Sequence, residues 1–413
     1  MNKYKLILLR LKFRAIARWT SSLRSRFGGV GWRLVSLRHR SARSSEAMTR
    51  SHIARAATAE FRWDSTAKGK WSFIWLVLIT LVLVGAGCSF KTASRTADGG
   101  VYRSDDLGKT WQQKVFAGQQ NNKNVTIASL DIRDLQFSAA DTGVLAAVAG
   151  DKGLLITSDG GEQWRQIYQQ PATAVAIHPT AKDTFYIAAG NRIYRTTDSG
   201  QNWQTVYLDT TPDAQITAVA TNRANDKQIL AASSRGILLQ SLDSGNSWEQ
   251  LYLFKAAIAK ILFNQVNGKL IFVAQTDGRL WRSYDSGVSW TDLSNTIKQL
   301  NPRRGSYQAM TFVADTANIL YATQNGLMLG SEAGEKWSNL KLVTAPGAVA
   351  LVSLAVHPKL PNNIFYTTAT GFYRSADKGE TWQTSSLPSS RLPSSMAINP
   401  SANNQIYLGF TRK

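Results

Sequence analysis

The sequence predicts an all-β fold, a seven-bladed β-propeller, from three observations. The first is an eight-residue motif, Ser/Thr-x-Asp-x-Gly-x-x-Trp, that recurs between residues 104 and 382. The second is its spacing, because successive motif tryptophans lie 39 to 53 residues apart, a period typical of propellers. The third is a set of short apolar segments, separated by turn residues, between one motif and the next.

Seven copies of the motif occur, and six of them keep both the Asp and the Trp. The seventh copy, Gly330–Trp337, is degenerate because Gly replaces the Ser/Thr and Glu replaces the Asp. The residues that define the copies are Asp106 with Trp111, Asp159 with Trp164, Asp198 with Trp203, Asp243 with Trp248, Asp285 with Trp290, Asp377 with Trp382, and Trp337 in the degenerate copy.

Each residue of the motif suits a tight turn between two strands. Asp and Ser/Thr side chains hydrogen-bond to backbone groups close by in the chain, and Gly adopts the positive φ that such turns need. The Trp brings a large apolar surface into the space beside the turn. A catalytic acid is needed once, whereas this Asp recurs. We therefore interpret the motif as structural, and not as a source of catalytic groups or metal ligands.

This motif resembles the Asp box, the repeat of bacterial neuraminidases (BNR). The number and spacing of the copies resemble those of photosystem II stability/assembly-factor propellers and, more distantly, those of the sortilin and sialidase propellers. The resemblance covers about residues 99–413. It implies the propeller fold strongly but no single function, because sialidases, sortilins and assembly factors all carry Asp boxes.

The segments between boxes predict four strands per blade. In one well-defined unit the strands are Thr173–His178, Thr184–Ala189, Arg192–Thr196 and a fourth strand, Trp203–Tyr207, that starts at the box Trp. Strands inside a ring of blades are covered on both faces. This explains apolar pairs where a one-sided sheet would show alternation.

The two ends of the repeat region predict one shared blade. Ser395–Asn399 and Gln405–Phe410 supply two strands at the end of the chain. Gly100–Ser104 and Trp111–Phe116 supply the other two at the start of the repeats. Six whole units and this shared unit give a seven-bladed ring that both ends close.

The first 98 residues divide by composition into three parts. Residues 1–70 hold 17 Lys/Arg against 3 Asp/Glu, which predicts a basic cytoplasmic tail, disordered or partly helical, or a shorter leader if Met48 is the start. Residues 71–90 carry no charge and predict a transmembrane anchor, followed by a spacer over residues 91–98. The positive-inside rule then places the propeller across the membrane.

The only cysteine, Cys88, allows a second form of anchor. Gly85-Ala86-Gly87-Cys88 resembles a bacterial lipobox, which implies lipid attachment at Cys88 in place of an uncleaved signal anchor. A single cysteine also excludes an intrachain disulfide. Both alternatives place the propeller on the periplasmic, extracellular or thylakoid-lumen side of a membrane.

Arginines that stand next to the boxes are the candidates for binding a partner. A ring of such arginines would bind acidic segments of a protein. In the alternative interpretation they are strand-end charges, solvated or stacked on the following blade. The candidates are Arg103, Arg195, Arg282 and Arg374, each directly before a box, and Arg303 and Arg304 in a longer inter-blade loop.

The sequence favours a non-catalytic function. Four His and one Cys leave little from which to build a zinc site or a Cys/His dyad, and we expect no cofactor. Sialidases use an Arg-Ile-Pro motif, and none occurs after residue 90. An exo-glycosidase of sialidase type remains the enzymatic alternative, because two carboxylates on loops would suffice for it.

The resemblance to assembly factors implies a protein-binding scaffold that assists the assembly of membrane protein complexes. The expected partner is a membrane protein or an exposed segment of one, with contact to the membrane through residues 71–90. We expect a monomeric propeller and no nucleic-acid binding, since no binding module for nucleic acid is recognisable. A sortilin-like peptide receptor is a further alternative, although that family adds a cysteine-rich module that this chain lacks.

Overall fold

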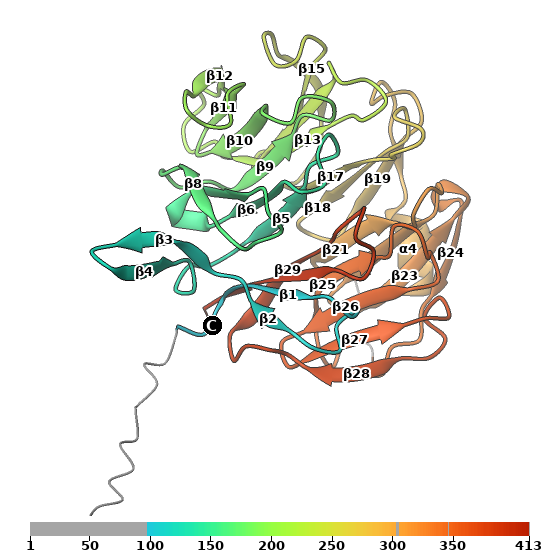
Figure 1. The fold of residues 1–413 in the computed structure, drawn as a ribbon. Coiled ribbons are helices and arrows are strands. Elements are labelled where there is room, and N and C mark those ends of the chain that lie inside the picture. Colours follow the sequence, from blue (N-terminus) through green and yellow to red (C-terminus); the bar gives the residue numbers. More distant parts are fainter. Residues whose placement is uncertain (1–96, 303–304, 346, 413) are drawn as a thin grey trace, which may run out of the picture. The chain divides into compact units, whose positions relative to one another are not determined.

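The computed structural model describes residues 97–302, 305–345 and 347–412. These residues form seven four-stranded antiparallel sheets, one extra two-stranded hairpin and a short helix (Figure 1). The predicted all-β, seven-bladed propeller is confirmed. Among the described residues, no helix has the length and apolar character needed to span a membrane.

Each sheet is one blade, and the first strand of each blade lies at the centre of the ring. The inner strands contact one another in the order β5, β9, β13, β17, β21, β25, β29 and back to β5, so the ring is closed. Blades 1 to 3 contain β5 (Asp134–Phe137), β6 (Leu145–Val148), β7 (Leu154–Thr157), β8 (Arg165–Tyr168); β9 (Ala174–Ile177), β10 (Phe185–Ala189), β11 (Arg192–Thr196), β12 (Gln204–Leu208); β13 (Ile216–Thr221), β14 (Ile229–Ser233), β15 (Ile237–Ser241), β16 (Glu249–Leu253).

Blades 4 to 6 repeat this order along the chain. They contain β17 (Ile258–Phe263), β18 (Ile271–Gln275), β19 (Leu280–Ser283), β20 (Thr291–Asp292); β21 (Tyr307–Phe312), β22 (Ile319–Thr323), β23 (Gly326–Ser331), β24 (Lys336–Asn339); β25 (Leu351–Val356), β26 (Ile364–Thr368), β27 (Gly371–Ser375), β28 (Gln383–Ser386). The second strands are buried almost throughout, since each lies between two neighbouring blades.

Blade 7 combines strands from the two ends of the described chain. Its order is β29 (Leu392–Ile398), β30 (Ile406–Thr411), β1 (Gly100–Ser104) and β2 (Gln112–Gln113). All five residues of β1 pair with β30, from Gly100 opposite Phe410 to Ser104 opposite Ile406. A side chain also connects the end of the described chain to the segment before β5. Asp131 accepts hydrogen bonds from the backbone N–H and the guanidinium of Arg412 at 2.8 and 2.9 Å.

Two elements are absent from the sequence prediction. The strand predicted over Trp111–Phe116 ends at Gln113, and the chain then forms a hairpin of β3 (Phe116–Gln120) and β4 (Lys123–Thr126) before it enters blade 1. The helix α4 (Ser294–Leu300) lies between blades 4 and 5. The hairpin projects from the blades (Figure 1), and all residues of β4 are exposed.

Several predictions concern residues outside the described part of the chain. These are the basic tail at 1–70, the anchor at 71–90 with Cys88, most of the spacer at 91–98, and the arginine pair Arg303 and Arg304. They stay predictions.

Candidate functional site

The six complete Asp boxes share one hydrogen-bonded turn, which the box of blade 4 illustrates. The Ser283 hydroxyl donates to Asp285 Oδ1 at 2.8 Å and accepts from the Gly287 N–H at 2.8 Å. Asp285 also accepts from the backbone N–H and the hydroxyl of Ser289, at 2.9 and 2.6 Å. The carboxylate therefore closes the turn with its two oxygens, and little acceptor capacity is left for a ligand.

Positive φ angles at two successive positions explain the box Gly. In blade 4, Ser286 has φ 63° and Gly287 has φ 97°. A Cβ on Gly287 would lie 2.6 Å from Cδ2 of Leu251 on the preceding blade. Gly is thus required both by the backbone and by the close approach of the neighbouring blade.

The box tryptophans pack between blades. Trp164 is 1% exposed, and its indole N–H donates to the carbonyl of Lys114 at 2.9 Å. The indoles of Trp203 and Trp382 likewise donate to carbonyls of the preceding blade. Those of Trp248, Trp290 and Trp337 donate to the Gly carbonyl of their own box.

The degenerate box keeps the shape of the turn without its Asp. Ala333 and Gly334 have φ 55° and 82°, which match the two positive φ angles of the complete boxes. Lys336 and Glu332 form an ion pair at 2.7 Å across this turn. The Trp337 indole still packs beside Tyr321, with ring centroids 6.4 Å apart.

The box carboxylates make the propeller sensitive to acid. The Ser289 hydroxyl, followed by the Ser289 N–H, lowers the pKa of Asp285 from 3.8 to about 2. The equivalent groups of Ser247 and Thr381 lower the pKa values of Asp243 and Asp377 to about 2. Because the pKa is lowered by folding, the stability these carboxylates contribute is complete above the ordinary value and is lost as pH falls toward 2.

We therefore expect the free energy of unfolding to fall steeply between about pH 4 and pH 2, since several boxes titrate together. Urea titrations at a series of pH values measure this slope. The Asp285→Asn variant should show a shallower slope over the same interval, because one titrating carboxylate is gone. A slope that the substitution leaves unchanged would contradict this role of the box.

Three of the four arginines that precede a box connect their blade to the next one. Arg103, Arg195 and Arg282 donate to the carbonyls of Gly160, Ser244 and Ala333 at 2.9, 2.8 and 3.0 Å. Each acceptor is the fourth residue of the following box. These arginines are therefore occupied by contacts within the ring, which fits the structural interpretation of the set.

In further blades, other side chains donate to the carbonyl of the fourth box residue. Arg165 donates to the Ser199 carbonyl at 3.1 Å, and Gln228 donates to the Ser286 carbonyl at 3.4 Å. Tyr186 and Tyr407 add second donors to the carbonyls of Ser244 and Gly160. Arg374 differs, because its guanidinium has no hydrogen bond or ion pair within the described residues.

Arg282 and Arg374 form a matched pair for testing these roles. Arg282→Ala is expected to lower the free energy of unfolding by about 2 kcal/mol, because it leaves a carbonyl without its charged donor and removes the ion pair with Glu335. Arg374→Ala should change it by less than about 0.5 kcal/mol. Urea unfolding of both variants measures the difference, and equal effects would contradict the assignment.

The axial channel is lined by the seven inner strands. Its polar lining includes Thr173, Thr217 and Ser394. The hydroxyls of Thr173 and Thr217 donate to the first carbonyl of the next inner strand, and that of Ser394 donates to a carbonyl just before the next inner strand. Within the described residues, the carboxylates that line the channel are Asp134, which pairs with Lys260 at 3.7 Å, and Asp315. Asp134 begins β5 and Asp315 follows β21, so the two lie at opposite mouths of the channel.

That separation is wider than the spacing within a single pair of glycosidase carboxylates. Inner strands of this length place the two carboxylates on the order of 15–20 Å apart along the axis. Glycosidases need two carboxyl groups roughly 5–10 Å apart. Over residues 97–302, 305–345 and 347–412, no group of three or more His, Cys, Asp or Glu side chains is arranged to hold a metal ion.

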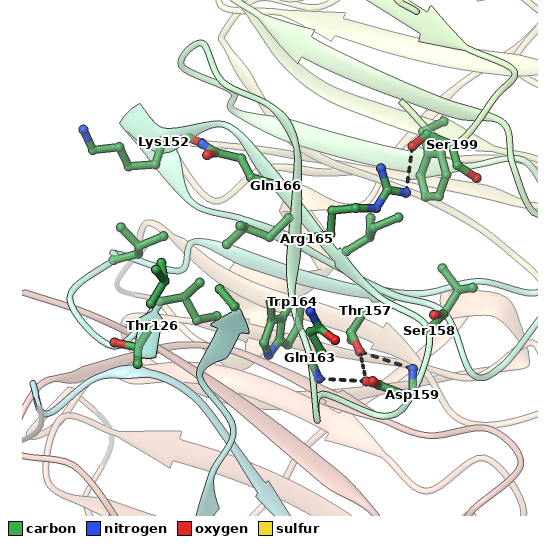
Figure 2. Close-up of a pocket in the computed structure, with 18 of the residues that line it drawn as sticks. Thr126, Lys152, Thr157, Ser158, Asp159, Gln163, Trp164, Arg165, Gln166 and Ser199 are labelled. Carbon is green, nitrogen blue, oxygen red and sulfur yellow. Dashed lines mark hydrogen bonds between the residues drawn. The ribbon is translucent and has the colours of Figure 1, made fainter. Parts of the chain in front are cut away.

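A groove with a volume of about 800 Å³ surrounds the outer strand of blade 1 (Figure 2). We call it the β8 groove. Its lining comes from the β3–β4 hairpin on one side, from β8 itself, and from the box and first loop of blade 2 on the other. The residues that line it include Ala117, Val125, Leu130, Lys152, Leu155, Trp164, Arg165, Gln166, Lys182 and Asp183.

The start of the β3–β4 hairpin is hydrogen-bonded to the residue just before β8. The N–H of Trp164 donates to the carbonyl of Phe116 at 2.8 Å, so the start of β3 lies along the outer edge of this strand. The hairpin then diverges, and Arg165 and Gln166 are exposed. Backbone groups two residues apart in a strand face the same side, so those of Gln166 face the same edge as those of Trp164.

Sequence reasoning does not identify the β8 groove. Lys152 and Lys182 lie in loops without a motif, and the hairpin lacks the alternation of apolar and polar residues by which strands are predicted. The groove exists only because three parts of the chain meet in space: blade 1, blade 2 and the connection that contains the β3–β4 hairpin. No local signal in the sequence could have indicated it.

Comparison with known proteins supports this description of the fold. A family model described as sortilin, neurotensin receptor 3 (Sortilin-Vps10) matches residues 152–237, which include two boxes. Together with the seven blades and the six complete boxes, this match decides the repeat type. The chain is an Asp-box β-propeller. No curated protein matches this propeller by sequence.

Solved structures with the same fold include two GH74 enzymes and two structures of YCF48. The GH74 xyloglucanase from Xanthomonas campestris is similar over 73% of this chain, with a TM-score of 0.58 and 16% identity. The GH74 enzyme from Niastella koreensis is similar over 72%, with a TM-score of 0.57 and 14% identity. The Asp-box propeller spans about half the length of these two enzymes, 52% and 53%.

The match to YCF48 covers nearly the whole of that protein. YCF48 from Cyanidioschyzon merolae is similar over 68% of this chain and 96% of its own, with a TM-score of 0.54 and 16% identity. A structure of YCF48 bound to a D1 peptide is similar over 72% and 99%, with a TM-score of 0.54 and 17% identity. At these identities the likeness establishes the fold of the Asp-box propeller.

Proposed function

We propose that the chain is a non-catalytic protein-binding scaffold that assists the assembly of membrane protein complexes, in the manner of photosystem II assembly factors. The observation that carries this proposal is the match to YCF48 over almost its full length, including a structure of YCF48 with a bound peptide. The separation of Asp134 and Asp315 supports a function other than glycoside hydrolysis.

The scaffold works at a membrane surface in this proposal. Residues 71–90, or a lipid on Cys88, tether the propeller on the periplasmic, extracellular or thylakoid-lumen side. Its partner is a membrane protein or an exposed segment of one. The propeller acts as a monomer and uses no cofactor.

Pulse labelling of newly made membrane proteins tests the assembly role. In a host from which the gene is removed, assembly intermediates of at least one membrane complex should accumulate on native gels and should disappear when the gene is restored. An unchanged assembly course for all labelled complexes would overturn the proposal. In a photosynthetic host, photosystem II is the first complex to follow.

An exo-glycosidase is the second candidate, favoured by the likeness to GH74 enzymes. Incubation of the full chain with a panel of fluorogenic sialosides and glucosides separates the two candidates. The scaffold proposal requires no turnover above a denatured control. Turnover that is lost on replacement of Asp134 or Asp315 would favour the enzyme.

A further inference from the structure

We propose that Arg374 and Lys109 form an anion-binding site between blades 6 and 7, and that this site takes the carboxylate of an acidic side chain of a partner protein. The inference rests on the proposed scaffold function, and it names the surface and the chemistry of the partner. It is carried by a comparison of the contacts between successive blades. One of these contacts keeps the arginine of the others and lacks the acceptor that it meets there.

The contacts that contain an arginine share one arrangement. We call the contact between the end of the third strand of one blade and the box of the next blade a joint. At three joints, the arginine before one box meets an acceptor side chain at the sixth position of the next box. The pairs are Arg103 with Glu162 at 2.9 Å, Arg195 with Asn246 at 2.9 Å and Arg282 with Glu335 at 2.8 Å.

The joint between blades 6 and 7 has the arginine but no acceptor. Arg374 precedes the box of blade 6, and the sixth residue of the box of blade 7 is Lys109. Neither side chain forms an ion pair within the described residues. Because the sixth box residue lies opposite the arginine at the other joints, the repeat places two cations opposite each other here. Lys109 is exposed and Arg374 is half-buried, so a ligand can reach both from solvent.

Apolar packing holds this joint in place of polar contacts. The ring of Phe372 packs on that of Trp111, with centroids 5.3 Å apart and planes at 78°. On the second strand, the residue paired with the arginine is Phe365. Its equivalents in blades 2 and 7, Tyr186 and Tyr407, donate to the fourth residue of the next box, and Phe365 has no hydroxyl to do so. The arginine of this joint is therefore left without a structural partner.

The loops beside the joint carry positive charge only. They are the first loops of blades 6 and 7, residues 357–363 and 399–405, and each is hydrogen-bonded to the box of its own blade. They contain Lys359, which is exposed, and no Asp or Glu. Burial lowers the pKa of the His357 imidazole in the first of these loops, and the positive charges of Arg374 and Lys359 lower it further.

The carboxylates of the two boxes are engaged elsewhere. Asp106 and Asp377 accept hydrogen bonds on both carboxylate oxygens from their own turns. Asp105 pairs at 3.0 Å with Arg103, which contacts blade 1. Glu380 is the sixth residue of the box of blade 6, so the repeat places it opposite blade 5. The charges left without a partner in the joint are a guanidinium and an ammonium group, and complementarity selects a carboxylate.

Exchange of the lysine for glutamate tests the geometry. Lys109→Glu supplies the acceptor found at the other joints, so it should pair with Arg374 and raise the midpoint of thermal unfolding of the full chain by about 1–2 °C. The same exchange in an Arg374→Ala background should give no rise, because the partner is gone. Lys269→Glu makes the same change of charge at an exposed lysine of blade 4 and is the matched control. No rise, a rise that the control equals, or a rise that persists without Arg374 would overturn the inference.

Thermal unfolding with an added peptide tests the ligand chemistry. The probe is acetyl-Gly-Glu-Glu-Gly-amide, and the comparison peptide has Gln in place of Glu, at equal concentration and ionic strength. The Glu peptide should raise the midpoint by about 1–2 °C at millimolar concentration, because it binds the folded state, and the Gln peptide should not. Arg374→Ala and Lys109→Glu should each abolish this rise, and Lys269→Glu should keep it. Equal effects of the two peptides, or a rise that survives in Arg374→Ala, would contradict the proposed site.

Failure of this inference can be told apart from failure of the scaffold function. If the Glu peptide has no effect while assembly intermediates still accumulate without the gene, Arg374 and Lys109 do not form the binding surface and the scaffold proposal stands. If the peptide stabilises the chain as predicted while assembly is unchanged, the anion-binding site stands and the scaffold function falls.

Discussion

A chain that ends at residue 391 is expected to lose cooperative unfolding altogether. Residues 392–413 contain β29 and β30, whose side chains Ile406, Tyr407, Leu408 and Phe410 are fully buried. Without them, β1 loses its five paired partners, and the inner strands β25 and β5 lose the neighbour that joins them. The cost of exposing this surface exceeds the roughly 5–15 kcal/mol that stabilises a typical domain.

Thermal unfolding followed by near-ultraviolet circular dichroism measures this effect. The full chain should show one sharp transition, and the shortened chain should show none. The control removes only residues 412 and 413, which deletes the ion pair of Arg412 with Asp131 and should shift the midpoint by a few degrees at most. A sharp transition at an unchanged midpoint in the shortened chain would show that the ring does not depend on this closure.

Trp164→Ala is expected to destabilise the propeller by about 3–5 kcal/mol. Trp164 is the box tryptophan that is fully buried, because the connection from Lys114 to Ile127 covers it, and its indole N–H donates to the Lys114 carbonyl. Truncation leaves a cavity between blade 1 and that connection and an unpaired carbonyl. It should also loosen the hairpin that forms one side of the β8 groove.

Urea unfolding compares this variant with Trp382→Ala, in which the same residue type is partly exposed in its box. The second substitution should cost clearly less, because less apolar surface is lost. If both variants lost the same free energy, burial would not explain the role of the box tryptophan. If neither lost any, the boxes would not hold the blades together.

The recurrent boxes made the fold predictable from sequence. Each box fixes a turn through its own side chains, so Ser283, Asp285 and Gly287 carry the same local information as their equivalents elsewhere. The strands could be placed between boxes because their apolar residues lie in short runs bounded by turns. Gly100–Ser104 and Arg192–Thr196 appear in the structure with the predicted bounds.

Elements without such signals were not predictable. The strand β4, Lys123–Thr126, is exposed at every residue, so no pattern of burial distinguishes it from a loop. The helix α4 has no side-chain cap at its start, and so lacks the usual helix signal. Both elements lie in connections between blades, where the repeat imposes no fixed length.

The roles of the arginines depended on contacts between blades. The sequence places Arg103, Arg195, Arg282 and Arg374 at one position of the repeat, but does not determine what each side chain reaches. The structure gives three of them a carbonyl of the next box and leaves Arg374 without such a partner in the described residues. The surrounding residues differ from blade to blade, which the repeat alone does not reveal.

Affinity capture from cross-linked host membranes tests the central claim, that the propeller holds a protein partner, most directly. The tagged full chain should enrich subunits of an incompletely assembled membrane complex, whereas the chain shortened at residue 391 should enrich none of them. Recovery of the same proteins with both chains, or of no membrane protein with either, would contradict the account.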